Sequence, residues 1–176
     1  MKSFIFSLCV VLSQAGVVSA VYADDVNLPK FSEVVTGQIY RSAQPTDTGL
    51  AELAQQYHVK TVISLRDEDK NQIQQEGNTV VSLNMNFVSV PLSGFFSPSD
   101  TDMNRVLADL QNPDLLPILI HCQHGEDRTG LAVGLYRVLV QNVAPKDAYQ
   151  EMLDHGFHPL LLGLKDYFED RTGFDP

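Results

Sequence analysis

Apolar and polar positions along the chain follow two alternating periods, one typical of strands and one typical of helices. Short runs of apolar and β-branched residues predict four strands, over 38–42, 60–65, 87–92 and 116–120. Helical spacing predicts helices through 50–57, through 103–110, over 131–140, over 145–156 and near 160–170. Strands and helices therefore alternate along most of the sequence.

Three segments carry a weaker signal. Residues 24–36 are largely polar, and we expect them to form a loosely held N-terminal lead-in. Residues 71–84 begin with a glutamine-rich stretch that favours a helix, whereas the Gly-Asn pair at 77–78 favours a break. Residues 93–102 contain two adjacent phenylalanines and are expected to form a loop.

The alternation predicts an α/β fold, with a single central, mostly parallel sheet flanked by helices. Ligands of such sheets bind at the carboxyl ends of the strands. Cys122, the loop that starts at Arg66 and Asp67, and the 93–102 loop all follow a predicted strand, and Arg41 lies near the end of another. We therefore expect these groups to share one edge of the sheet.

The N-terminal segment is typical of an export signal. A single lysine, an apolar stretch from residue 4 to 18 and small residues ending at Ala23 predict a secretory signal peptide over 1–23. Cleavage after Ala20, or a retained anchoring helix, are the alternatives. We expect a protein that is periplasmic or secreted, without a stable membrane anchor, and a domain that spans residues 37–176.

Composition limits the kinds of binding partner and the cysteine chemistry that we expect. The formal net charge is −10 and becomes −11 once the segment with its single lysine is removed. Such an acidic chain, with a pI near 4.7, is a poor candidate for nucleic acid or anionic lipid surfaces. Cys9 would leave with the signal peptide, so Cys122 would be the only thiol, which excludes an internal disulfide.

The densest chemical signal is the run from His121 to Gly130, between the last predicted strand and the 131–140 helix. A loop in this position can turn its backbone N–H groups and a helix N-terminus toward an anion. Arg128 adds a planar fork that can hold two phosphate oxygens. The same field favours a thiolate at Cys122, which could attack a bound phosphate and form a phosphocysteine.

The remaining residues of this loop complete the candidate site. The hydroxyl of Thr129 is placed to stabilise the sulfur when water later displaces it. The other loop positions are expected to bind the phosphate group; they are Gln123, His124, Gly125 and Glu126.

The sequence His-Cys-x5-Arg-Thr-Gly resembles the signature loop of the cysteine-dependent protein tyrosine and dual-specificity phosphatases. The order of upstream segments, from Gly37 to Pro45 onward, is similar to the compact atypical dual-specificity branch of bacteria. The resemblance implies a protein tyrosine phosphatase-like fold, a phosphocysteine intermediate and no cofactor or metal.

The resemblance also exposes a departure, because the position of the usual general acid falls near Ser93 and Gly94, which cannot donate the proton. Asp127, within the loop, is the first candidate acid, as in relatives whose loops end in Asp-Arg-Thr-Gly. Asp100 and His124 are the alternatives, with helix capping as the competing role for Asp100. Asp127 could instead only orient a neighbouring loop.

Two further arginines are weaker candidates for substrate binding. Arg41 and Arg66 could help to bind the phosphate, or could simply pair with Glu33 and Asp67 at the surface.

We expect a monomeric phosphatase that acts on phosphotyrosine or, with dual specificity, on phosphoproteins. The alternative substrate is an inositol polyphosphate or phosphoinositide, for which Arg41, Arg66, Arg105 and Lys165 would have to converge. A phosphate-binding module without turnover, a thiol-redox role, and a metal site built from His121, Cys122 and His124 with His155 or His158 rank lower.

Overall fold

The computed structural model describes residues 27–175, which form five strands and six helices. The strands are β1 (Ser32–Val35), β2 (Ile39–Ser42), β3 (Thr61–Ser64), β4 (Asn86–Ser89) and β5 (Ile118–His121). The helices are α1 (Asp47–Gln55), α2 (Lys70–Ser82), α3 (Asp100–Gln111), α4 (Asp127–Leu139), α5 (Pro145–Asp154) and α6 (Leu162–Thr172). The expected signal peptide lies outside the described residues.

All five strands belong to one sheet with the order β1-β2-β5-β3-β4. Only the pair β1 and β2 is antiparallel, so the prediction of a mostly parallel sheet is confirmed. Ser42, His121 and Ser64 lie in register across the three central strands. The residues that follow these strands therefore meet at one edge of the sheet, as the sequence predicts.

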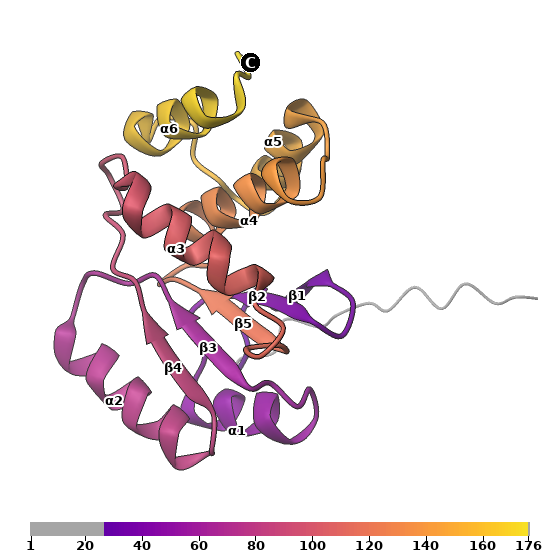
Figure 1. Ribbon diagram of the computed structural model, residues 1–176. Helices are drawn as coiled ribbons and strands as arrows, with labels where there is room; N and C mark the ends of the chain where they lie inside the picture. Colours follow the sequence, from indigo (N-terminus) through magenta and orange to yellow (C-terminus); the bar gives the residue numbers. More distant parts are fainter. Residues whose placement is uncertain (1–26, 176) are drawn as a thin grey trace, which may run out of the picture.

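Helices cover both faces of the sheet (Figure 1). On one face, α1 and α2 pack against the sheet through a cluster that includes Leu53 and Val62. On the other, α3 to α6 enclose the larger core, where Ile120 of β5 meets Leu131 and Phe168. The central strands are buried along their whole length because apolar residues point to both faces, as parallel sheets require.

The N-terminal segment is more ordered than the expected lead-in, at least from residue 27 onward. Residues 32–35 form the edge strand β1. Leu28 is buried in the same apolar cluster as Leu50 and Leu53 of α1. The amide of Ala43 donates to the carbonyl of Pro29 at 2.8 Å, which ties the segment to the end of β2. The prediction of a loosely held lead-in is therefore wrong for this part.

Most of the uncertain stretch 71–84 lies within α2, which ends at Ser82 and is continuous through Gly77. The expected break is wrong because a neighbouring ring occupies the space of the missing side chain. A Cβ at Gly77 would lie 2.8 Å from the Phe87 ring of β4. Close helix–strand packing thus outweighs the low helix propensity of glycine, which is about 1 kcal/mol.

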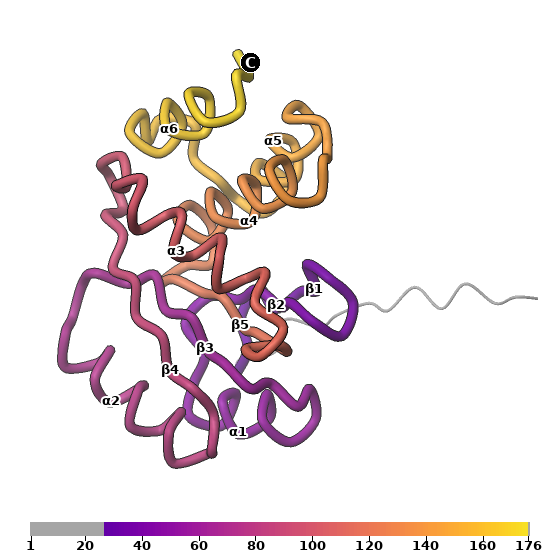
Figure 2. Tube along the Cα trace, viewed as in Figure 1, coloured from indigo at the N-terminus to yellow at the C-terminus, as the bar shows by residue number. Residues whose placement is uncertain are grey.

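Two segments that are distant in the sequence come together beside this edge. The stretch before α3 reaches the start of α6 (Figure 2), and the Ser97 hydroxyl donates to the Gly163 carbonyl at 2.8 Å.

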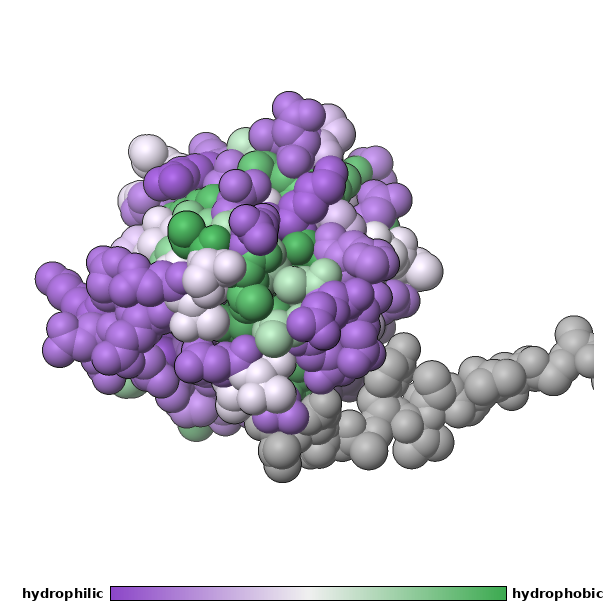
Figure 3. Space-filling model, turned by 90° about the horizontal axis from the view of Figure 1, so that it is seen from below, coloured by the Kyte–Doolittle hydropathy of each residue, from purple (hydrophilic) through white to green (hydrophobic). Residues whose placement is uncertain are grey.

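On the face seen from below, apolar residues gather in the middle between hydrophilic flanks (Figure 3). Among the described residues, none of the helices has the length and apolarity that crossing a membrane requires.

Candidate active site

The loop between β5 and α4 is shaped around the Cys122 sulfur, which accepts a hydrogen bond from the Gly125 amide at 3.2 Å. Gly125 has a φ of +70°, and a Cβ there would lie 2.6 Å from the Ala43 nitrogen. Glycine is required because the left-handed backbone and the contact with the end of β2 leave no room for a side chain. Cys122 itself is 2 % exposed, at the floor of a cavity.

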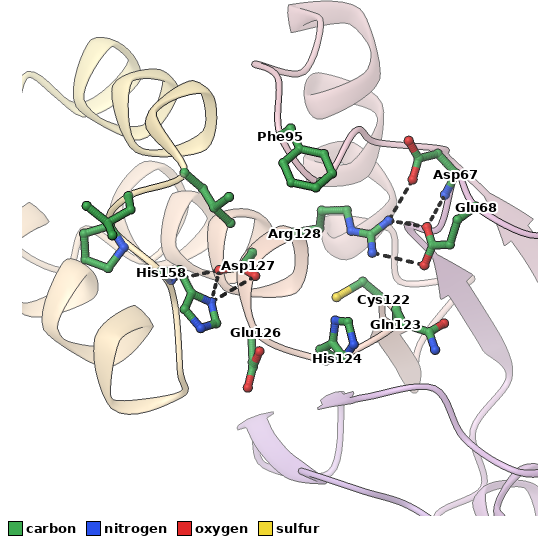
Figure 4. A pocket seen from close by; sticks show the side chains of 14 residues that line it. Asp67, Glu68, Phe95, Cys122, Gln123, His124, Glu126, Asp127, Arg128 and His158 are labelled. Carbon is green, nitrogen blue, oxygen red and sulfur yellow. Dashed lines mark hydrogen bonds and ion pairs between the residues drawn. The ribbon is translucent and has the colours of Figure 1, made fainter.

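Arg128 is held in place by two carboxylates that follow β3 (Figure 4). Its Nη1 donates to Glu68 at 2.7 Å and to Asp67 at 3.0 Å, and its Nη2 donates to the second Glu68 oxygen at 3.2 Å. Within residues 27–175 no acceptor is bonded to the Nε of Arg128. The N–H of Nε and the second N–H of Nη2 are thus available to donate to a phosphate.

The pKa values of these two carboxyl groups, Asp67 and Glu68, are shifted in opposite directions. Partial burial works to raise the pKa of Glu68, but the hydrogen bonds from Arg128 and the backbone outweigh it and hold that pKa well below its usual range. Partial burial and the neighbouring Glu68 raise the pKa of Asp67 above its ordinary value. Asp67 is therefore the more easily protonated of the pair.

Arg41 lies directly beneath the loop. It is 1 % exposed, and its Nη2 donates to the Gly125 carbonyl at 2.8 Å. Its Nη1 is buried without a hydrogen-bond partner among the described residues. Burial lowers the pKa of Arg41 to about 10, although the negative charges of Glu151 and Cys122 oppose this. The suggested surface pair with Glu33 is wrong.

Arg66 is also 1 % exposed and belongs to a buried network beside the loop. Its Nη1 donates to the side chains of Gln44 at 2.5 Å and Gln72 at 2.9 Å, and its Nε donates to Glu68 at 3.2 Å. Asp67 bonds Arg128 instead of Arg66, so the suggested surface pair is wrong. Neither Arg66 nor Arg41 lines the cavity above Cys122. Both arginines support the loop and its neighbours from behind.

The signature histidine is fixed by the same network. Its Nδ1 lies 3.2 Å from the Cys122 carbonyl, and its Nε2 lies 2.9 Å from a Glu76 oxygen. Glu76 in turn accepts from Gln44 at 2.8 Å. His121 is fully buried and does not line the cavity, so neither of its nitrogens is open to a ligand there.

The cavity above Cys122 has a volume of about 840 Å³ and an acidic, partly apolar lining. Among the described residues, Arg128 is the only lysine or arginine of the lining, which also contains four carboxyl groups, those of Asp67, Glu68, Glu126 and Asp127. Gln123 and His124 of the signature loop also line it. The wall is completed by Gly94, Phe95, His158, Pro159, Leu160 and Leu161.

Asp127 faces this cavity and is bonded to the connection between α5 and α6. One of its oxygens accepts from the His158 backbone at 2.8 Å and lies 3.0 Å from the His158 Nδ1. Because a carboxylate only accepts, the proton of this ring lies on Nδ1 when the ring is neutral. Asp127 therefore orients the neighbouring segment, and it also lies in the same cavity as the thiol.

The other candidate acids are placed differently. Asp100 lies in the first turn of α3, where Ser99 is the cap, and accepts from Tyr167 at 2.8 Å and Arg171 at 3.1 Å. It does not line the cavity, and its bonds to Tyr167 and Arg171 hold it outside the site. His124 is exposed at the cavity.

Thr129 and Glu126 are the other predicted residues of the signature loop. The Thr129 hydroxyl is buried and makes no hydrogen bond within the described part of the chain, including none to Cys122. Glu126 is paired with Lys30 from the N-terminal segment. One ligand atom each of Glu126, Asp127 and His158 lie within 4.8 Å of one another. They are not a vacant metal set, because Lys30 neutralises one carboxylate and the His158 Nδ1 faces the other.

Sequence reasoning missed the residues that reach the site from other segments. Glu68 left a signal, since it lies in a charged run directly after a buried strand. His158 to Leu161 left none, because only the packing of α5 and α6 brings them to the cavity.

Comparison with known proteins agrees with this geometry. A family model described as DSP-PTPase phosphatase fused to NAD+ kinase matches residues 13–159. The dual specificity protein phosphatase TpbA of Pseudomonas aeruginosa is 37 % identical over 138 residues, which are 77 % of this chain and 57 % of TpbA. The inositol diphosphatase SIW14 of Saccharomyces cerevisiae is 32 % identical over 113 residues, 62 % of this chain and 39 % of that protein.

Solved structures extend the likeness to the fold. The catalytic core of SIW14 from S. cerevisiae, in complex with citrate, superimposes with a TM-score of 0.71 at 27 % identity, covering 82 % of this chain and 86 % of that one. P. aeruginosa TpbA gives 0.68 at 28 % identity, covering 87 % and 89 %. The chain spans little more than half the length of the first curated relative. The family match covers most of the sequence, and the chain belongs to the DSP-PTPase family of cysteine-dependent phosphatases.

Proposed function

We propose that this protein hydrolyses phosphate monoesters through a phosphocysteine intermediate, acting on phosphotyrosine or with dual specificity on phosphoproteins. One observation carries the proposal: the Cys122 sulfur accepts from a loop amide at the floor of a cavity into which Arg128 also projects (Figure 4). A thiol, an inward N–H group and an oriented guanidinium together fit the charge and shape of a phosphate.

The chemistry follows from these positions. The Cys122 thiolate attacks phosphorus, the S–P bond forms, and the P–O bond to the leaving group breaks while an acid protonates that oxygen. Water then attacks the phosphocysteine, a base takes its proton, and inorganic phosphate leaves with the thiolate restored. Arg128 binds the equatorial oxygens in both steps, with Glu68 holding the guanidinium in position.

The unpartnered Thr129 hydroxyl acts in the second step, the hydrolysis of the phosphocysteine. It is buried without a hydrogen bond in the described residues, so no other acceptor holds it in the resting site. A hydrogen bond to the departing sulfur in that step would lower the cost of expelling a thiolate.

Two carboxyl groups of the cavity compete for the role of the acid. Asp127 accepts hydrogen bonds from His158, which orient its carboxyl group beside the cavity. Asp67 has a raised pKa, which favours the protonated form that an acid needs. If Asp127 is the acid, Asp127→Asn should impair alkyl phosphates far more than aryl phosphates with good leaving groups, and Asp67→Asn should not; the opposite pattern assigns the role to Asp67.

The charges of the cavity favour a phosphoprotein over an inositol polyphosphate. A ligand with several phosphates needs several cations, but Arg41 and Arg66 are buried outside the cavity lining. Arg105 lies beside Asp109 and Lys165 beside Glu169, and neither lines the cavity. A single phosphate beside an aromatic ring suits one arginine and Phe95 better. A solved TpbA variant is in complex with phosphotyrosine, which supports this choice.

The test compares wild type with Cys122→Ser on a panel of phosphotyrosine peptide, phosphothreonine peptide and inositol hexakisphosphate. We expect wild type to hydrolyse the peptides and the serine variant to lose turnover while vanadate binding remains measurable. Lys146→Ala, an exposed position outside the cavity lining, serves as the control for handling and folding. Turnover by Cys122→Ser would refute the covalent mechanism, and exclusive hydrolysis of the inositol phosphate would assign the alternative substrate.

We further propose that the protein is exported, with residues 1–23 removed as a signal peptide. A charged residue in place of Leu12 should block processing, and sequencing of the mature N-terminus should identify Ala23 or Ala20 as the last residue removed. An unprocessed chain in the cytoplasmic fraction would contradict export.

A further inference from the structure

The exposed apolar residues of the described chain are concentrated beside the cavity. Six large hydrophobic side chains are strongly exposed in residues 27–175, and four of them lie in two neighbouring segments. We call these four the apolar wall: Phe95 at 72 % exposed, Phe96 at 75 %, Leu160 at 90 % and Leu162 at 61 %. Clusters of exposed apolar side chains mark interaction surfaces more often than scattered ones do.

The apolar wall is one preformed structure, although its residues are far apart in the sequence. Ser97 donates to the Gly163 carbonyl at 2.8 Å, so the segment before α3 is tied to α6. A Cβ at Gly163 would lie 2.6 Å from the Phe95 carbonyl oxygen, which shows how closely the two backbones approach. The Ser93 hydroxyl accepts from the amides of Phe95 and Phe96, both at 3.1 Å, and fixes the turn.

The wall is continuous with the site that holds the phosphate. Phe95 and Leu160 line the cavity above Cys122, whereas Phe96 and Leu162 lie beyond its lining. A group that covers the outer part of the wall is therefore attached to, or directly beside, the phosphorylated residue.

The charge of the cavity identifies the chemistry of that group. Among the described residues, four carboxyl groups and one arginine line the cavity, together with the exposed His124 and His158. Lys30 and Arg66 pair with Glu126 and Glu68 from outside the lining, which still leaves more negative than positive charge around the cavity. An acidic neighbour of the phosphorylated residue would be repelled by these carboxylates, and an apolar or basic neighbour would not.

We propose that the apolar wall binds a large apolar side chain next to the phosphorylated residue of a protein substrate. The chain would then select phosphopeptides with an apolar neighbour and discriminate against acidic neighbours. This inference rests on the proposed phosphatase function, which it deepens by naming the substrate class. An anionic membrane is a poor occupant, because the described surface around the site is itself acidic and the chain carries a net charge of −10.

The experiment measures kcat/KM for phosphotyrosine peptides that differ only in the flanking residues, which are leucine, serine or aspartate. The value for each variant is divided by its own kcat/KM for p-nitrophenyl phosphate, so that changes in the chemistry cancel. We expect wild type to prefer leucine over serine by about tenfold or more, since covering part of a phenylalanine or leucine side chain is worth about 1.4 kcal/mol.

The variants are Phe96→Ser and Leu162→Ser, which should remove most of this preference. Val81→Ser and Leu139→Ser are matched controls, because they also replace exposed apolar residues but lie outside the wall, and they should keep it. Equal rates on all three peptides, or an equal loss in the controls, would overturn the inference while hydrolysis of p-nitrophenyl phosphate still supported the proposed function.

Two other outcomes would assign the wall to a different occupant and so overturn the inference. One is binding of the full chain to phosphatidylcholine vesicles that Phe96→Ser abolishes. The other is a concentration-dependent dimer, measured by sedimentation, that the same substitution dissociates. Absence of turnover on every substrate would instead refute the proposed function itself.

Discussion

Replacing Arg41 with methionine should lower activity without lowering stability. The guanidinium is buried beneath the loop, has one hydrogen bond to the Gly125 carbonyl, and leaves Nη1 unpaired among the described residues. At pH 7 the arginine is protonated in both the folded and the unfolded chain, so the full cost of burying the charge is present. A pKa that falls from the ordinary arginine value to about 10 corresponds to roughly 3 kcal/mol of that cost, at 1.36 kcal/mol per tenfold change.

Methionine fills a similar volume and removes this cost, but the Gly125 carbonyl then loses its donor, which is worth about 1–3 kcal/mol. The two effects nearly cancel, and we expect a variant that is as stable as wild type or up to about 2 kcal/mol more stable. For a domain of this size, 1 kcal/mol moves the Tm by about 2–4 °C. The measurement is thermal unfolding at pH 7.

Activity should respond in the opposite direction. The loss of the anchor frees Gly125, and the loss of a positive charge near Cys122 disfavours the thiolate. We expect kcat/KM for p-nitrophenyl phosphate to fall at least about tenfold, and the rate at which iodoacetamide alkylates Cys122 at pH 7 to fall as well. Arg41→Lys keeps the charge but not the fork, so its alkylation rate should stay closer to wild type. A drop in Tm of about 10 °C in Arg41→Met, or unchanged kinetics, would refute this account.

Three further substitutions test the site and its support. Gly125→Ala should reduce kcat/KM by about 100-fold or more, because its Cβ would lie 2.6 Å from the Ala43 nitrogen, just after β2. Steady-state kinetics test this, with circular dichroism as the check of folding, and unchanged activity would contradict it. Glu68→Gln should weaken vanadate binding by loosening Arg128. Because the pKa of Glu68 is lowered in the folded chain, wild type should lose stability as the pH falls from its unfolded value near 4.5, and the glutamine variant should lose less; parallel acid-denaturation curves would contradict this. Gly77→Ala should lower the Tm, although alanine normally stabilises a helix, because the new methyl group meets the Phe87 ring at 2.8 Å; a raised Tm would show that the ring yields.

Local patterns in the sequence were sufficient for most of the architecture. The strand before Cys122 and the helix that follows the signature loop depend on neighbouring residues, so periodicity predicts them. The pairing of β1 with β2 and the continuity of α2 were missed. Each depends on a contact with a segment that is distant in the sequence, such as the Phe87 ring against Gly77.

The sequence by itself determined the reactive core of this protein, because a phosphate loop is built from consecutive residues whose spacing already fixes the thiol, the glycine and the arginine. Tertiary structure alone decided what surrounds that loop: Glu68 against Arg128, Arg41 beneath Gly125, and the apolar wall at the rim of the cavity. The physical reason is that these contacts join separate segments. Their geometry depends on the packing of helices and strands, which no local pattern records.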